Sequence, residues 1–277
     1  MLKLKLNNGI EMPILGFGTF LNNGTDCEQS VCTAIKNGYR LIDTAEAYGN
    51  EEQVGNGIKQ SSVDRKELFI VTKVNFKSYE NTRETVLASL EKLGTDYLDL
   101  VLLHWPFGNY YKAWRELEEL YAEGKIRAIG VSNFESDRLI DLIHFNKVVP
   151  AVNQIETNLH CQRKAEHEWM KKYNVQHMSY APLGQGSRSE MFTQPEVVAL
   201  AEKYDKTPAQ IMLRFLTQQD VIVIPKSIHE ERIKENFDIF DFTLTEDELE
   251  ILKAADTATA KIGNPEQPEM VEFAMTW

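Results

Sequence analysis

A short apolar run followed by a longer amphipathic segment recurs along the whole chain, and this repeat limits the fold more than any other feature. Eight buried strands are expected at the apolar runs 14–18, 40–43, 68–73, 98–104, 126–132, 151–156, 175–183 and 221–225. The segments between them have helical periodicity, and several end in a glycine, as is common just past a helix end: Gly38, Gly94 and Gly124. Strands that alternate with helices are parallel, and strands that are apolar throughout are buried on both faces.

An open doubly wound sheet and a closed (β/α)8 barrel both satisfy this pattern. Eight units in 277 residues favour the barrel, which typically takes about 250 residues. We therefore predict an α/β protein, a single (β/α)8 TIM barrel domain over residues 1–277. The opening stretch 3–13 predicts a hairpin with its turn at Asn8-Gly9, covering the bottom of the barrel. The stretch 245–256 predicts an extra C-terminal helix after Thr245.

Composition limits the classes of partner that the protein is expected to bind. The net charge of −12 argues against binding to nucleic acid or to an anionic membrane, because both require a basic surface. No apolar run approaches the length of a signal peptide core or a bilayer span. Cys27, Cys32 and Cys161 form no CxxC pair, and the six histidines show no metal-ligand spacing. We expect a cytoplasmic protein that is a monomer, with no metal, nucleic-acid or membrane partner.

Three successive strands end on an ionisable side chain. The runs "RLID", "FIVTK" and "LVLLH" finish at Asp43, Lys73 and His104, and Tyr48 lies on the loop after the first of them. Neighbouring parallel strands place these ends side by side at the edge where barrels hold their chemistry. An ion pair at the rim, with a hydrogen-bonded core histidine, would explain any one of these residues. The set of four indicates a functional site.

Proton transfer is the chemistry that this set supports. A free tyrosine has a pKa of about 10, and a nearby ammonium favours the phenolate, so Lys73 is expected to lower the pKa of Tyr48. Asp43 would keep Lys73 charged and in position. A neutral His104 would hydrogen-bond an incoming carbonyl oxygen, which makes Tyr48 a candidate general acid.

A redox cofactor would need a binding site, and the usual fingerprint for one is absent. The stretch "GFGTF" has Gly16 and Gly18, but Leu21 stands where GxGxxG requires a third glycine, so a Rossmann site is not supported.

A phosphate site is a candidate at the end of the eighth run. Lys226, Ser227 and Arg232 gather where that strand gives way to a helix, and the last two loops of barrels often bind phosphate. A solvated helix face, with Glu230, Glu231 and Glu235 offsetting the cations, explains the same segment equally well.

Eight motifs in the expected order resemble the aldo-keto reductase family. They are "GFGTF" (16–20), "GYRLIDTAEAYGNE" (38–51), "TKV" (72–74), "LLHWP" (102–106), "GVSNF" (130–134), "NQIE" (153–156), "SYAPLGQG" (179–186) and "IPKSIHEERIKEN" (224–236). The resemblance spans nearly the whole chain and implies carbonyl reduction with NADPH/NADP+, through the tetrad Asp43, Tyr48, Lys73 and His104.

The resemblance also implies the contacts of the cofactor. Its binding residues would be Gly18, Thr19, Asp43, Ser132, Asn133, Gln154, Tyr180, Pro182, Leu183, Gln185, Ser187, Lys226, Ser227, Ile228, Arg232, Glu235 and Asn236. Ser132, Asn133 and Gln154 would hold the carboxamide, and Tyr180 would stack on the nicotinamide. Leu183 to Ser187 would cover the pyrophosphate. The cation pair Lys226 and Arg232 would select NADPH over NADH.

The small-molecule substrate would be a carbonyl bound by Phe20, Tyr48, Asn75, His104 and Trp105, with the C-terminal tail as a further wall. His229 departs from the family pattern, which often has threonine or serine there. The short segment after "LLHWP" and the short tail are typical of the compact microbial branch, which implies an open pocket and broad specificity.

Two other functions are compatible with the sequence. An NADPH-binding regulatory or interaction protein could keep the fold with little catalysis. A lyase or isomerase barrel would use the Lys73 amine as a nucleophile, although an adjacent Asp43 that keeps the amine protonated argues against this.

Overall fold

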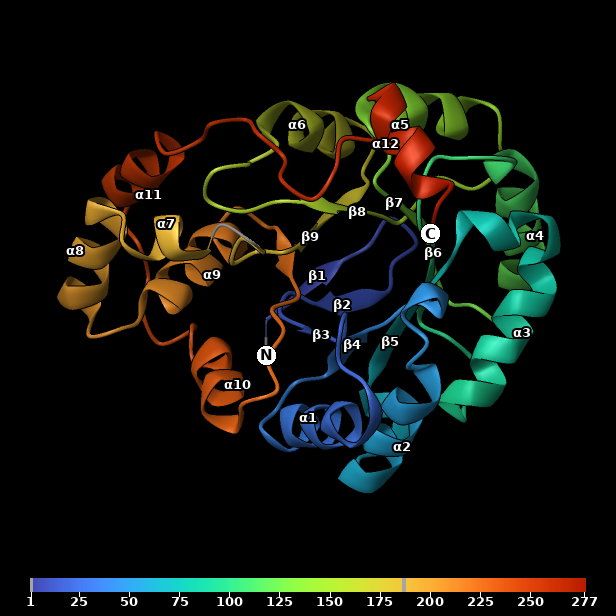
Figure 1. Cartoon of the computed structure of the whole chain (residues 1–277), viewed down its shortest axis with the longest axis horizontal. Helices are drawn as coiled ribbons and strands as arrows, with labels where there is room; N and C mark the ends of the chain where they lie inside the picture. The colour runs from blue at the N-terminus through green and yellow to red at the C-terminus, as the bar shows by residue number, and fades with distance from the viewer. Residues whose placement is uncertain (1, 186–187) are drawn as a thin grey trace.

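The computed structural model describes residues 2–185 and 188–277, and its centre is a sheet of eight parallel strands (Figure 1). The strands run in the order β10-β9-β8-β7-β6-β5-β4-β3. They are β3 (Phe17–Gly18), β4 (Leu41–Asp43), β5 (Phe69–Val74), β6 (Leu100–Leu103), β7 (Ile129–Ser132), β8 (Val152–Glu156), β9 (Gln176–Tyr180) and β10 (Ile222–Val223). Each strand lies within a predicted apolar run or overlaps its end by one residue, and the eight-strand prediction is confirmed.

Hydrogen bonds between the first and last strands close the sheet into a barrel. Gly16 N donates to Val223 O at 2.8 Å, Val223 N donates to Ile14 O at 3.0 Å, and Gly18 N donates to Pro225 O at 3.1 Å. Two glycines permit the close packing of this first strand. A Cβ on Gly16 would lie 2.4 Å from Leu41 Cγ, and one on Gly18 would lie 2.9 Å from Ile224 O. The glycines of "GFGTF" therefore have a packing role.

Helices surround the barrel (Figure 1). They are α1 (Gly24–Lys36), α2 (Glu51–Ser61), α3 (Thr82–Leu93), α4 (Tyr110–Ala122), α5 (Ser136–His144), α6 (Lys164–Lys172), α7 (Arg188–Phe192), α8 (Pro195–Tyr204), α9 (Pro208–Thr217), α10 (Glu230–Phe237), α11 (Glu246–Lys253) and α12 (Pro268–Ala274). Short 3-10 helices lie at η1 (Glu46–Tyr48), η2 (Arg65–Glu67) and η3 (Phe76–Asn81). Gly94 ends α3 with a φ of 64°, and Thr245 begins α11 with a capping box that includes Glu248. Both of these sequence signals predicted the local structure correctly.

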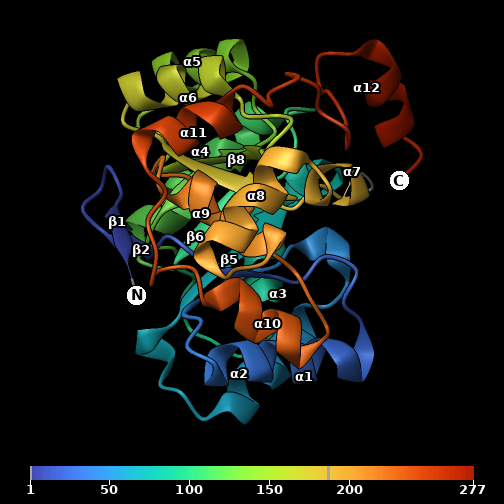
Figure 2. The ribbon, with the colours of Figure 1, turned by 90° about the vertical axis from the view of Figure 1, so that its left-hand side faces the viewer.

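The N-terminal hairpin and the C-terminal helix lie at opposite ends of the barrel (Figure 2). The hairpin pairs β1 (Lys3–Lys5) with β2 (Glu11–Pro13). Asn7 Nδ2 donates to Pro150 O at 2.9 Å, and Asn8 Nδ2 donates to Arg127 O at 3.0 Å. These carbonyls precede β8 and β7, so the hairpin covers the bottom of the barrel as predicted.

The helix α12 was not predicted, and it lies at the end of the barrel away from the hairpin (Figure 2). The extra helix expected at 245–256 is α11, so two helices follow the eighth strand. None of the helices in the described residues is both long and apolar enough to span a membrane.

Candidate active site

Lys73 is the centre of the polar cluster at the C-terminal edge of the strands. Its side chain is fully buried, and its ammonium Nζ donates to Asp43 Oδ1 at 2.6 Å, to Thr44 O at 2.8 Å and to Tyr48 Oη at 3.4 Å. Asp43 and Lys73 end up adjacent because β4 and β5 are neighbours in the barrel. Burial lowers the pKa of Lys73 and raises the pKa of Asp43, and the contact between the two charges opposes both shifts.

Tyr48 ends the 3-10 helix η1, and its ring also lies 5.1 Å from the Lys73 ammonium. Burial, together with the negative charge of Asp43, raises the pKa of Tyr48 well above its ordinary value. The prediction that Lys73 lowers this pKa is therefore wrong for the structure, because Asp43 offsets the lysine charge and desolvation disfavours the phenolate. Tyr48 consequently holds its proton at neutral pH, which a proton donor must do.

His104 follows β6 and faces Tyr48, with 5.8 Å between the ring centroids. Burial and the Lys73 charge lower the pKa of His104 well below 6.5, so the imidazole is neutral as predicted. Its Nδ1 atom is buried and has no hydrogen-bond partner among the described residues. An unpaired lone pair costs less than an unpaired N–H, so we assign the proton to Nε2, which is then a hydrogen-bond donor.

Hydrogen bonds of Gln154, Asn133 and Tyr180 connect this cluster to β7, β8 and β9. Gln154 Nε2 donates to Asp43 Oδ2 at 2.8 Å, so Gln154 holds the carboxylate that holds Lys73. Asn133 Nδ2 donates to the His104 carbonyl at 3.0 Å, and Tyr180 Oη donates to Asn133 Oδ1 at 2.7 Å. The sequence did not indicate the Gln154–Asp43 bond, since 111 residues separate the pair.

Three of the nine described non-glycine residues with a positive φ angle lie at the same edge of the barrel. Leu21, Asn133 and Ala181 have φ angles of 59°, 61° and 49°, in the left-handed region that non-glycine residues rarely adopt. All three belong to loops that follow barrel strands. Such strain often marks functional sites, and it is a feature that sequence patterns do not reveal.

The end of β3 and the loop after it contain Gly18, Thr19 and Phe20, which were expected near the cofactor or substrate. Thr19 is fully buried, and its hydroxyl donates to Asp43 O at 3.0 Å, so it supports β4. Phe20 is 43% exposed, and its ring centroid lies 4.9 Å from that of Tyr48. Ser132 is buried beside Asn133, and its hydroxyl donates to Gln154 O at 2.9 Å.

The segment after β10 has two exposed cations and three acidic residues. Lys226 and Arg232 are exposed and form no ion pair among the described residues. Glu230 pairs with Lys234 at 2.7 Å, and Glu235 accepts a hydrogen bond from Thr207 at 2.7 Å. Glu231, the third acidic residue of the segment, is exposed and forms no ion pair among the described residues.

Other predicted residues lie around this segment. Ser227 and Asn236 are buried, Ile228 is exposed, and the backbone N–H of His229 donates to Ser227 Oγ at 3.0 Å. Arg188, which was not predicted, lies close enough for the charge of Arg232 to lower its pKa, in addition to a larger effect of burial.

The predicted pyrophosphate segment follows β9. Pro182 is buried, Leu183 is half-buried and Gln185 is exposed, whereas Ser187 lies outside the described residues.

Aromatic rings surround the approach to Tyr48 and His104. Trp105 is 7% exposed, and its ring centroid lies 5.3 Å from that of Trp277 in the C-terminal tail. Trp277 also lies 6.2 Å from Phe76. Asn75 is half-buried, and its side chain caps η3 by accepting from Lys77 N at 3.0 Å. The C-terminal tail was predicted to form a wall of the pocket, but Trp277 was not named among the predicted residues.

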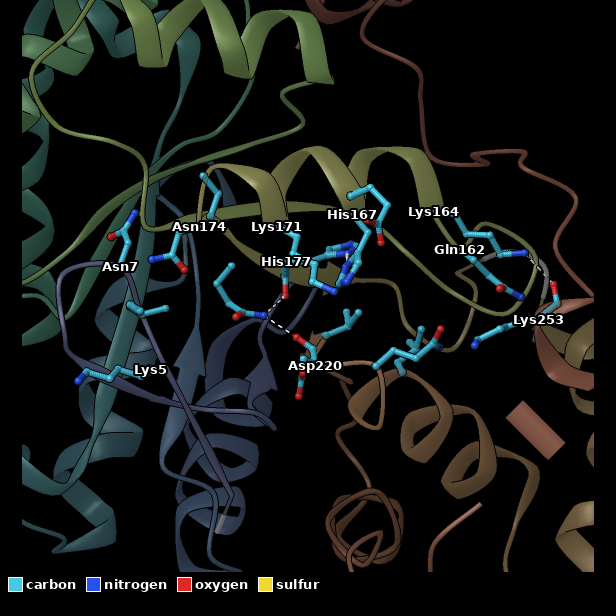
Figure 3. A pocket seen from close by; sticks show the side chains of 17 residues that line it. Lys5, Asn7, Gln162, Lys164, His167, Lys171, Asn174, His177, Asp220 and Lys253 are labelled. Carbon is cyan, nitrogen blue, oxygen red and sulfur yellow. Dashed lines mark hydrogen bonds between the residues drawn. The ribbon is translucent and has the colours of Figure 1, made fainter. Parts of the chain in front are cut away.

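A cavity of about 610 Å³ opens at the hairpin end of the barrel (Figure 3). Its lining includes Lys5, His167 and His177, with His167 Nδ1 and His177 Nδ1 3.0 Å apart. None of the predicted catalytic, cofactor or substrate residues lines it. It is separate from the candidate active site.

A buried Asp–Lys pair, a tyrosine that keeps its proton and a neutral histidine lie together at the C-terminal edge of the barrel. The model of the aldo/keto reductase family matches residues 15–257. The glyoxal reductase of Bacillus subtilis (strain 168) is 46% identical over 270 residues, covering 95% of this chain and 96% of that protein.

Two solved structures agree with this match. MGS-M4, an aldo-keto reductase enzyme from a Medee basin deep-sea metagenome library, has a TM-score of 0.93 at 43% identity, over 95% of this chain and 98% of that chain. The Bombyx mori aldo-keto reductase, solved in complex with NADP, has a TM-score of 0.87 at 34% identity, over 94% of each chain. The chain belongs to the aldo/keto reductase family and is an oxidoreductase of carbonyl compounds.

Proposed function

We propose that this protein reduces aldehydes and ketones to alcohols with NADPH, and that Tyr48 is the proton donor. The observation on which the proposal depends most is the distance of 3.4 Å between Lys73 Nζ and Tyr48 Oη, in a cluster that also contains Asp43 and the neutral His104. The family membership and the NADP complex of the Bombyx mori relative support the choice of cofactor.

The residues present fit a nicotinamide dinucleotide. Ser132, Asn133 and Gln154 would hold the carboxamide, and Gln154 Oε1 accepts no hydrogen bond from the described residues, so it is available to the amide N–H groups. Tyr180 would lie under the ring. When bound, NADPH supplies the hydride.

The adenosine end would bind after β10. Lys226, Ser227 and Arg232 would bind the 2′-phosphate, with Glu235 and Asn236 near the adenine. Pro182, Leu183, Gln185 and Ser187 would line the pyrophosphate, with Gly18, Thr19 and Ile228 along the remainder of the groove. Exposed cations without ion pairs support this assignment and the preference for NADPH over NADH.

The chain's own residues would act on the carbonyl oxygen. His104 Nε2–H donates a hydrogen bond that orients the oxygen, and Tyr48 gives its proton to the oxygen as negative charge develops. Lys73 stabilises the phenolate that remains, and Asp43 keeps Lys73 in place. An alkoxide is far more basic than a phenolate, so the raised pKa of Tyr48 does not prevent the transfer.

The substrates would be small carbonyl compounds of broad structure, bound among Phe20, Asn75, Trp105 and the tail. We further propose a single-domain monomer in the cytoplasm with no nucleic-acid partner. The net charge of −12 disfavours binding to a nucleic-acid backbone. A regulatory role with little catalysis is the alternative, and the same assay tests it.

Tyr48→Phe tests the proposal. We expect kcat for aldehyde reduction to fall by about 10²–10⁴-fold, with the NADPH Kd unchanged, because only the proton-donating hydroxyl is removed. Initial rates of NADPH oxidation and a fluorescence titration measure the two quantities. Tyr111→Phe, which removes a hydroxyl that donates to Asp141 on the outer helices, is the matched control. Near-normal turnover by Tyr48→Phe would contradict the assignment, and no turnover by the natural sequence across a carbonyl panel would favour the regulatory role.

A further inference from the structure

Glu156, the last residue of β8, is a buried carboxylate with an unusual set of partners. It is 1% exposed and forms no ion pair among the described residues. Its oxygens accept mainly from the backbone of the distant tail: Lys261 N donates to Oε1 at 3.1 Å and to Oε2 at 2.9 Å, and Ile262 N donates to Oε2 at 2.8 Å. A longer bond of 3.4 Å comes from the Asn158 side-chain amide to Oε1. A carboxylate that accepts several backbone N–H bonds makes a strong charge-assisted contact.

The tail also forms hydrogen bonds with the loop that follows Glu156. Thr257 donates from its backbone N–H at 2.9 Å and from its hydroxyl at 2.8 Å to His160 O. Gln162 N donates to Asp256 Oδ1 at 3.1 Å. These contacts hold the start of the tail, and Glu156 holds the point from which the chain turns towards α12.

The tail then leads to α12 and the C-terminus (Figure 2). After α12, the Trp277 ring contacts Trp105 and Phe76, and Phe273 packs on Trp277 with 5.8 Å between centroids. Trp105 follows His104 directly. The position of Trp277 against Trp105 therefore depends on where the tail is held.

We propose that Glu156 is a positioning residue that fixes the C-terminal tail and, through it, the Trp277 wall, so that it sets the affinity for aromatic carbonyls. The inference rests on the proposed function and adds the substrate class that this contact favours. Glu156 itself touches neither the carbonyl nor the proton donor in this scheme. A small dicarbonyl does not extend to the wall, so its reduction does not depend on Glu156.

Glu156→Gln tests the contact with almost no change of shape. One amide N–H₂ then faces backbone donors in place of an acceptor, so the tail loses its anchor. We expect the KM for 4-nitrobenzaldehyde to rise about fivefold, while kcat/KM for glyoxal and the Kd for NADPH stay within about twofold. Hydrogen exchange of the peptide 259–267 should become at least about tenfold faster.

Two further variants separate the anchor from a general loss of stability. Glu51→Gln removes another buried carboxylate, one that accepts from Thr72 on the far side of the barrel, and should leave the aromatic KM unchanged. In a Trp277→Ala background, Glu156→Gln should add less than about twofold to the aromatic KM, because the wall is already absent. Should Glu156→Gln fail to fold, Lys261→Pro deletes a donor from the other side of the contact and should raise the same KM.

The possible outcomes distinguish failure of the anchor role of Glu156 from failure of the proposed carbonyl reduction. Three results would each overturn the anchor role. They are an equal effect of Glu156→Gln on the reduction of both carbonyls, a fully additive effect on the aromatic KM in the Trp277→Ala background, and unchanged hydrogen exchange of the peptide 259–267. If the natural sequence reduces neither carbonyl with NADPH, the proposed function fails, whereas the exchange measurement still decides whether Glu156 holds the tail.

Discussion

At the scale of single residues, burial decides the charge states of the site. Tyr48 has a pKa well above its ordinary value, and His104 has one well below. The sequence identified both residues and the neutral state of His104, but it gave the wrong direction for Tyr48. A sequence shows which charges follow one another, but it does not show how much water a side chain loses.

The two shifts predict a broad pH profile. Reduction needs Tyr48 protonated, which holds below its raised pKa, and His104 neutral, which holds above its lowered pKa. We therefore expect kcat/KM for aldehyde reduction to be constant between pH about 6 and about 9.

Initial rates with saturating NADPH across this range measure the profile, and the His104→Asn variant identifies the contribution of the imidazole. An acid limb near pH 6.5 that His104→Asn removes would show that the imidazole titrates normally, against the structure.

At the scale of elements, the strand ends were predictable and the distant contacts were not. Strand periodicity placed Asp43, Lys73 and His104 on one edge, because parallel strands with buried faces leave few alternatives. The helix α12 was missed because a helix of seven residues depends on tertiary packing, which local signals do not show. The contact between Glu156 and the tail also depends on tertiary packing, so local sequence signals do not predict it.

Residues of helix α10 and of the loop before it are expected to discriminate between NADPH and NADH. Arg232→Ala should raise the Kd for NADPH about tenfold and change the Kd for NADH by less than about twofold, because only NADPH has a 2′-phosphate for the guanidinium. Fluorescence titration with both nucleotides measures the effect. Lys234→Ala, on the same helix but paired with Glu230, is the matched control. Equal weakening of both nucleotides would contradict the phosphate assignment.

At the scale of the whole molecule, the repeat of strand and helix predicted the barrel, the hairpin and the helix α11. The bonds that close the barrel between Gly16, Val223 and Ile14 join the first unit to the last. All the units therefore share one hydrophobic core, which extends from Leu6 to Ala274.

A shared core predicts a single cooperative transition. Urea unfolding followed by far-ultraviolet circular dichroism and by tryptophan fluorescence should give one midpoint, because the fully buried Trp114 and the barrel strands unfold together. Two separate midpoints would contradict the single-domain proposal.

Closure of the barrel also bears on aggregation. A sheet whose outer strands bond to each other presents no row of open backbone groups on which a second chain could add a strand. In the described part of the chain, strand edges of this kind remain at the hairpin β1–β2. Lys3 and Lys5 lie on its first strand, and charged lysines disfavour edge-to-edge pairing, so the most exposed strand of the molecule has its own protection against self-association.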